Sequence, residues 1–163
     1  MRSLRVVATV LLSVALMSTA CSGDDDEGGD KGSSGAPPAT GCAADDRKDV
    51  YTPGLSKEAG TLSVRLIESN PGPPIKGTNT MTLEVLDAAG QPVEGATLTV
   101  TPWMPDHAHG SAVKPVVTAT GGGKYTVEQI YLAMAGLWQI KVGVQTAGGG
   151  PLQEATFQFC LDG

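Results

Sequence analysis

The chain has 163 residues, a net charge of −6, 17% charged residues and 4% aromatic residues. Acidic residues outnumber basic ones and no basic stripe is present, so we exclude a nucleic-acid-binding protein. We also expect no enzyme, because no serine lies in a Gly-x-Ser-x-Gly frame and no acid pair stands out in an apolar setting.

The first element is a leader. Arg2 and Arg5 precede an apolar segment at 6–16, and the small residues 18–20 follow before Cys21. This order predicts a signal peptide at residues 1–20, and the apolar segment is shorter than the roughly 20 residues that span a bilayer. The small residues and cysteine resemble a bacterial lipobox, although Ser18 stands where lipoboxes most often carry leucine. We therefore expect a lipoprotein signal peptide and acyl chains on Cys21, which would anchor the chain to a membrane at the cell envelope, facing the periplasm or the exterior.

Residues 21–41 predict a disordered tether. The segment holds five acidic residues and one lysine, and most of the rest is Gly, Ser, Ala and Pro. It has no apolar face to bury, so folding could not offset its conformational entropy.

The remaining residues, 42–163, are long enough for one domain with its own core. Alternation of apolar and polar residues predicts strands of a half-buried sheet. About seven short strands separated by Gly and Pro turns favour an all-β fold, a β-sandwich. The expected strands are 62–67, 80–85, 96–101, 116–119, 125–127, 137–144 and 155–160. We expect residues 43–60, which are rich in charge and contain Pro53 and Gly54, to be an irregular lead-in.

The cysteines predict a disulfide. If Cys21 carries lipid, Cys42 and Cys160 remain, one at each end of the domain. An oxidising compartment and an even number of remaining cysteines favour a bond between them. Free thiols used for metal or redox chemistry are the alternative, which the absence of a Cys-x-x-Cys motif disfavours.

Four segments together resemble a known family. They are residues 87–96, the string Trp-Met-Pro-Asp-His-Ala-His-Gly at 103–110, residues 123–125, and Met-Ala-Gly-Leu-Trp at 134–138. Their order is similar to that of the YtkA-like domain, which is related to the FixH-like domains of respiratory copper biology. The resemblance covers roughly residues 60–146 and implies an immunoglobulin-like β-sandwich. It implies no particular activity.

Four residues are candidate metal ligands: Met104, His107, His109 and Met134. Met104 and the two histidines lie within six residues, and the resemblance places Met134 near them. Thioether and imidazole groups suit copper, because methionine selects Cu(I) and histidine serves either oxidation state. If residues 107–109 are extended, both imidazoles point to one side of the strand. A Met/His set on exposed loops also resembles the periplasmic copper chaperones that supply respiratory oxidases.

The same residues allow a structural interpretation. Met104 and Met134 would fill gaps in the core, and the histidines would hydrogen-bond to loop backbone. Zinc or another metal is a further alternative. The sequence therefore predicts a non-catalytic, lipid-anchored envelope protein that handles copper through the Met/His loop. The alternative is a structural or adaptor lipoprotein that binds another envelope protein.

Overall fold

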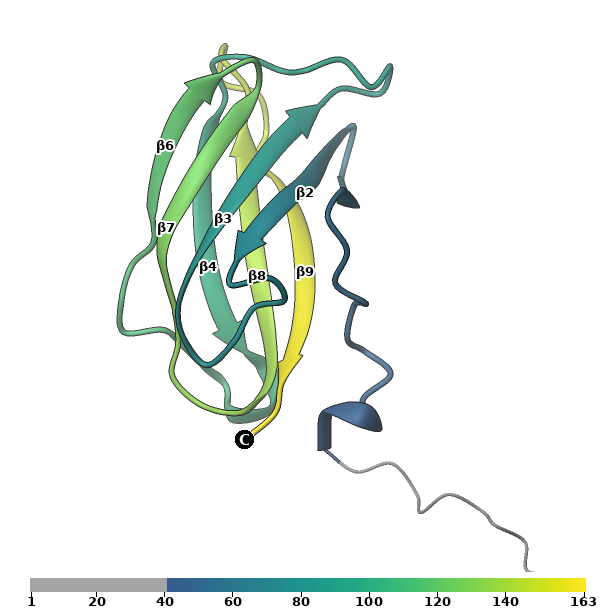
Figure 1. Ribbon diagram of the computed structural model, residues 1–163. Helices are drawn as coiled ribbons and strands as arrows, with labels where there is room; N and C mark the ends of the chain where they lie inside the picture. Colours follow the sequence, from purple (N-terminus) through teal and green to yellow (C-terminus); the bar gives the residue numbers. More distant parts are fainter. Residues whose placement is uncertain (1–40) are drawn as a thin grey trace, which may run out of the picture. The chain divides into compact units, whose positions relative to one another are not determined.

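Two antiparallel sheets pack face to face in the computed structural model, which describes residues 41–163 (Figure 1). The predicted leader, Cys21 and the tether up to residue 40 lie outside the described residues. Gly41, which we assigned to the tether, begins the short 3-10 helix η1 (Gly41–Ala43).

The first sheet has five strands and the second has four. In spatial order, the first contains β1 (Leu55–Ala59), β2 (Leu62–Asn70), β3 (Gly77–Leu86), β7 (Lys124–Leu132) and β6 (Val116–Gly121). The second contains β5 (His109–Gly110), β4 (Thr97–Met104), β8 (Gly136–Gln145) and β9 (Gln153–Leu161). Figure 1 shows β2, β3, β7 and β6 in one layer and β4, β8 and β9 in the other. The predicted all-β sandwich is thus confirmed.

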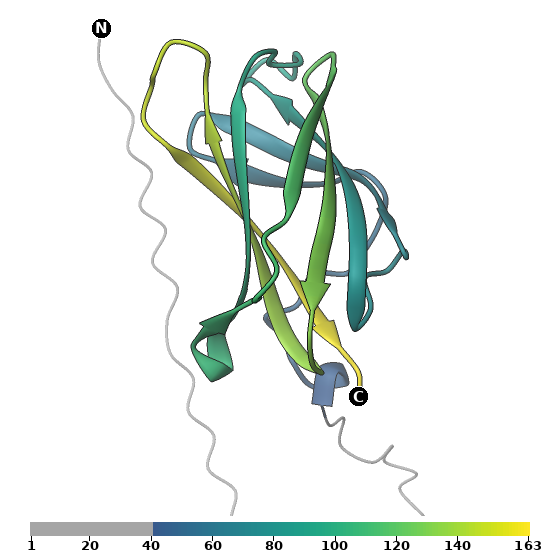
Figure 2. The same ribbon diagram turned by 90° about the vertical axis from the view of Figure 1, so that its left-hand side faces the viewer.

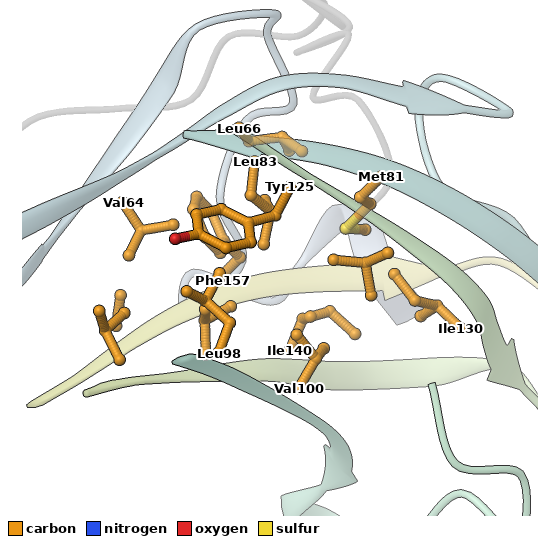
Figure 3. Close-up of a cluster of buried hydrophobic side chains, with 14 of the residues drawn as sticks. Val64, Leu66, Met81, Leu83, Leu98, Val100, Tyr125, Ile130, Ile140 and Phe157 are labelled. Atoms are coloured by element: carbon orange, nitrogen blue, oxygen red, sulfur yellow. The ribbon is translucent and has the colours of Figure 1, made fainter. Parts of the chain in front are cut away.

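The core follows from alternation along the strands. Every second residue of β2 from Leu62 to Leu66 is buried, while Ser63 and Arg65 are partly exposed. The same period holds in β4 and β9, because successive side chains of a strand point to opposite faces of its sheet. Figure 3 shows aliphatic side chains from both sheets meeting around Tyr125 and Phe157.

The structure has more strands than we expected. The expected irregular lead-in contains β1, which pairs with β2 from Leu55↔Leu66 to Ala59↔Leu62, so that part of the expectation is wrong. β1 shows no apolar alternation in the sequence, because it holds Lys57 and Glu58 and only one fully buried side chain, Ala59. The other strand that we did not expect, β5, has 2 residues and is too short to show alternation in the sequence. Within residues 41–163, no helix has the length and apolar character needed to cross a membrane.

The lead-in closes one side of the sandwich against β9. The Asp49 N–H donates to the Gln158 carbonyl at 2.7 Å, and the Gln158 N–H donates to Asp49 Oδ2 at 2.8 Å. Cys42 and Cys160 form the predicted disulfide, with Cα atoms 5.3 Å apart, a usual separation for such a bond. These contacts fix the first described residues to the last strand.

Candidate functional site

The histidine loop, residues 104–110, lies at one end of the second sheet. β4 ends at Met104, and Pro105 begins the short 3-10 helix η2 (Pro105–His107). Proline suits the first position of a helix because its φ is already helical and its missing N–H has no partner there. Ala108 then adopts a left-handed conformation, with φ of 53°, and its N–H donates to the Pro105 carbonyl at 3.3 Å. This turn reverses the chain into β5.

The two imidazoles come together through that turn. Their ring centroids are 5.8 Å apart at an interplanar angle of 65°. The condition of an extended segment over 107–109 is not met, because a helical turn and a left-handed residue lie between β4 and β5. The two rings meet through this turn instead.

Met104 and His109 are opposite each other in the β4–β5 ladder. Directly paired residues of an antiparallel ladder place their side chains on the same face, with Cβ atoms about 5 Å apart. Met104 is 1% exposed, so this is the inner face of the sandwich, and His109 is half-buried there. The His109 ring also meets buried Trp138 edge to face, with centroids 6.0 Å apart.

A backbone contact orients His109. Its Nδ1 lies 3.1 Å from the Gly110 carbonyl oxygen. A neutral imidazole that donates from Nδ1 keeps its lone pair on Nε2, which is the usual arrangement in a metal-ligating histidine.

The segment carrying Met134 lies at the same end of the sandwich. Trp138 Nε1 donates to the Met134 carbonyl at 3.0 Å, and this bond fixes the backbone before β8. Two residues later, Gly136 has φ of +118°, and a Cβ built on it would stand 2.5 Å from Met104 Cε. Gly136 therefore leaves room for the Met104 thioether, while the Met134 side chain lies on the surface, 38% exposed.

An ion pair holds the loop to the lead-in. Both guanidinium NH groups of Arg47 donate to Asp106, at 2.7 Å each, and Arg47 also pairs with Asp45 at 2.8 Å. The Arg47 guanidinium lowers the pKa of both carboxyl groups below their ordinary value, and the two carboxylates raise the pKa of Arg47. Sequence reasoning missed Arg47, because 59 residues separate it from Asp106 and no local pattern connects them.

The side chains present at the histidine loop limit which metal ions could bind there. Among residues 41–163, no three His, Cys, Asp or Glu side chains are grouped so that they could hold a metal ion. Asp106, beside His107, is already paired with Arg47. A metal at the histidine loop would therefore depend on imidazole and thioether groups, a soft set that suits Cu(I) better than Zn²⁺ or Mg²⁺.

Comparison with solved structures gives a match to a DUF4426 family protein from Pseudomonas aeruginosa PAO1, with 17% sequence identity and a TM-score of 0.49. The match covers 68% of this chain and 96% of that one. Comparison with curated proteins gives no match.

The family comparison covers the histidine loop. The sequence profile described as YtkA-like matches residues 56–143, which run from β1 into β8 and include Met104, His107, His109 and Met134. Both disulfide cysteines lie outside this range. Of the Arg47–Asp106 ion pair, only Asp106 lies inside it. The chain belongs to the YtkA-like family.

Proposed function

We propose that the chain is a non-catalytic, lipid-anchored protein of the cell envelope that binds copper at the histidine loop. The observation that carries the proposal is the pairing of His109 with Met104 across the β4–β5 ladder, with the His107 ring 5.8 Å from that of His109. Copper is the cargo of this site, which has no reaction to catalyse.

The arrangement supports Cu(I) in preference to Cu(II). Cu(I) is a soft ion that takes thioether and imidazole ligands, and Cu(II) favours tetragonal sets of nitrogen and oxygen. Met104 supplies a buried thioether from the core side, and the imidazoles lie toward the surface. Met134 would provide a second thioether by rotation of its exposed side chain.

Replacing the buried thioether tests the proposal. Met104→Leu keeps the volume nearly unchanged, so we expect it to cost less than about 1.5 kcal/mol of folding stability. Loss of one ligand should weaken Cu(I) affinity by about tenfold or more, because even the loss of groups that orient ligands costs about 10-fold to 100-fold. Anaerobic competition with a chromophoric Cu(I) chelator measures this.

Met81→Leu is the matched control. Met81 is also fully buried, but it lies in β3 of the other sheet. The Met81→Leu variant should bind Cu(I) with the same affinity as the unchanged protein. Equal affinity of both variants and the unchanged protein would remove Met104 from the site.

The paired change His107→Ala and His109→Ala separates copper binding from the adaptor alternative. Loss of Cu(I) with an unchanged melting temperature supports copper binding. Loss of fold in a protein that takes up no copper supports a structural role of the loop in an adaptor lipoprotein.

The anchor rests on the leader and Cys21, which lie outside the described residues. The intact mass of the chain extracted from membranes tests it. A chain that begins at Cys21 with added acyl mass supports the anchor, and an unprocessed, unmodified leader contradicts it.

A further inference from the structure

The edge of β4 from Thr97 to Thr101 differs from the other sheet edges in having no charge, bulge or proline that discourages pairing. A free edge exposes a row of backbone N–H and C=O groups, and proteins usually protect it with charges, bulges or covering segments. β1 carries Lys57 and Glu58, β9 is covered by the lead-in, and β6 is interrupted by a register shift between Ala119 and Gly121. β4 pairs with β8 from Thr97 to Trp103 without any shift and contains no charged residue.

Within residues 41–163, only the end of this edge, from Pro102 to Met104, is occupied. β5 pairs with Trp103 and Met104, and the Ser111 N–H donates to the Pro102 carbonyl at 3.2 Å. Because successive residues of a strand point their backbone groups to opposite sides, Leu98 and Val100 direct theirs to the same side as Pro102, away from β8. The stretch from Thr97 to Thr101 is therefore an open edge.

A groove runs along this open stretch. It has a volume of about 510 Å³ and is lined by β4 and by the segment that leads into β6, which contributes Val113, Lys114, Pro115 and Val117. Figure 2 shows β4 and β6 as neighbouring strands, one from each sheet, on this side of the sandwich. Val113, which lines the groove, is a large apolar side chain left 37% exposed.

We propose that a second copy of the chain covers this edge, with the two β4 strands pairing antiparallel about a two-fold axis at Thr99. In this register Leu98 of one copy faces Val100 of the other. The N–H and C=O groups of both residues, which point away from β8, then form hydrogen bonds between the two copies. Moving the axis by one residue, to Val100, would bring Leu98 opposite Pro102, which has no N–H and whose carbonyl is already bonded to Ser111. The free backbone groups therefore select Thr99 as the centre.

The length of the open stretch fits the same register. Thr97 faces Thr101 of the partner at each end of the paired segment. Beyond Thr101 the edge is taken by Ser111 and β5, and before Thr97 the chain turns at Gly95, with φ of 70°. The side chains at 97, 99 and 101 point away from the core, and all three are exposed threonines. Threonines opposite each other on neighbouring strands form favourable pairs. A two-fold contact of one patch with itself is the commonest form of association between identical chains.

Cysteine cross-linking tests the register in the full chain, with Cys21→Ser and a metal chelator present so that the added thiol is the only unpaired one. Thr99 is at a non-hydrogen-bonded pair, where Cα atoms lie about 4.5 Å apart, within disulfide range. Thr99→Cys should form a covalent dimer under mild oxidation. Thr97→Cys alone should not, because the two copies of residue 97 would be about 13 Å apart, and its mixture with Thr101→Cys should.

A charge at the axis tests the association without added thiols. Thr99→Lys opposes two lysines across the interface, and we expect self-association in sedimentation equilibrium to weaken by about tenfold. Thr118→Lys, at an exposed position of β6, is the matched control and should associate like the unchanged protein.

Three results would overturn the proposal. The unchanged chain could stay monomeric at every concentration, Thr97→Cys alone could link as readily as Thr99→Cys, or the edge could take only an extended segment of a different protein.

Discussion

Gly136 shows how one missing side chain shapes the candidate site. Its φ of +118° is a conformation that residues with a Cβ rarely adopt, and its Cβ position is taken by the methyl group of Met104. The residue therefore serves both the turn into β8 and the packing of a candidate ligand.

Comparing Gly136→Ala with Gly148→Ala separates these two roles. Gly148 has a similar φ of +129° but no neighbour within 4 Å of its Cβ position. We expect Gly148→Ala to lower the free energy of unfolding by about 1–3 kcal/mol through backbone strain alone. Gly136→Ala should lower it by about 1–3 kcal/mol more, because Met104 must move in a packed core. Urea unfolding measures both, and equal losses would show that Met104 yields freely.

At the scale of elements, the Arg47–Asp106 ion pair connects the lead-in to η2. Because the pKa of Asp106 is lowered in the folded state, the pair contributes stability above the unfolded pKa of about 3.9. That contribution is lost as the pH falls through the lower folded value. The groups are exposed, so salt should weaken the effect.

Arg47→Ala should return the pKa of Asp106 toward its ordinary value. The carboxyl carbon shift of Asp106, followed by NMR from pH 2 to pH 6, measures this. Arg65→Ala is the control, because Arg65 pairs with Glu84 on another sheet and should leave Asp106 unchanged. An identical Asp106 titration in the unchanged protein and in Arg47→Ala would contradict the role of the pair.

The elements that could be predicted were the strands in which apolar and polar residues alternate. The strands carrying Val64, Leu83 and Phe157 could be predicted because burial alternates along them. The grouping of His107 with His109 could be predicted from proximity in sequence, but its geometry could not, since it depends on a left-handed Ala108. Contacts such as Arg47–Asp106 depend on the tertiary fold and leave no sign in either segment.

At the scale of the whole molecule, the Cys42–Cys160 disulfide joins residues 118 positions apart. We expect Cys42→Ser with Cys160→Ser to lower the free energy of unfolding by about 2–5 kcal/mol, because a long cross-link restricts the unfolded chain. The denaturant slope of unfolding should rise, since the unfolded chain becomes more expanded. Reduction of the unchanged protein should reproduce both effects, and Cys21→Ser should cause neither.

The place where the chain enters the domain has a consequence for delivery. Gly41 and Asp106 line one cavity of about 420 Å³ together with Ala135 and Gly136, so the histidine loop lies at the entry end of the sandwich. Under the proposed lipid anchor, the histidine loop would lie beside the point where the tether joins the domain. An ion acceptor that docks at the histidine loop would then also lie beside the tether.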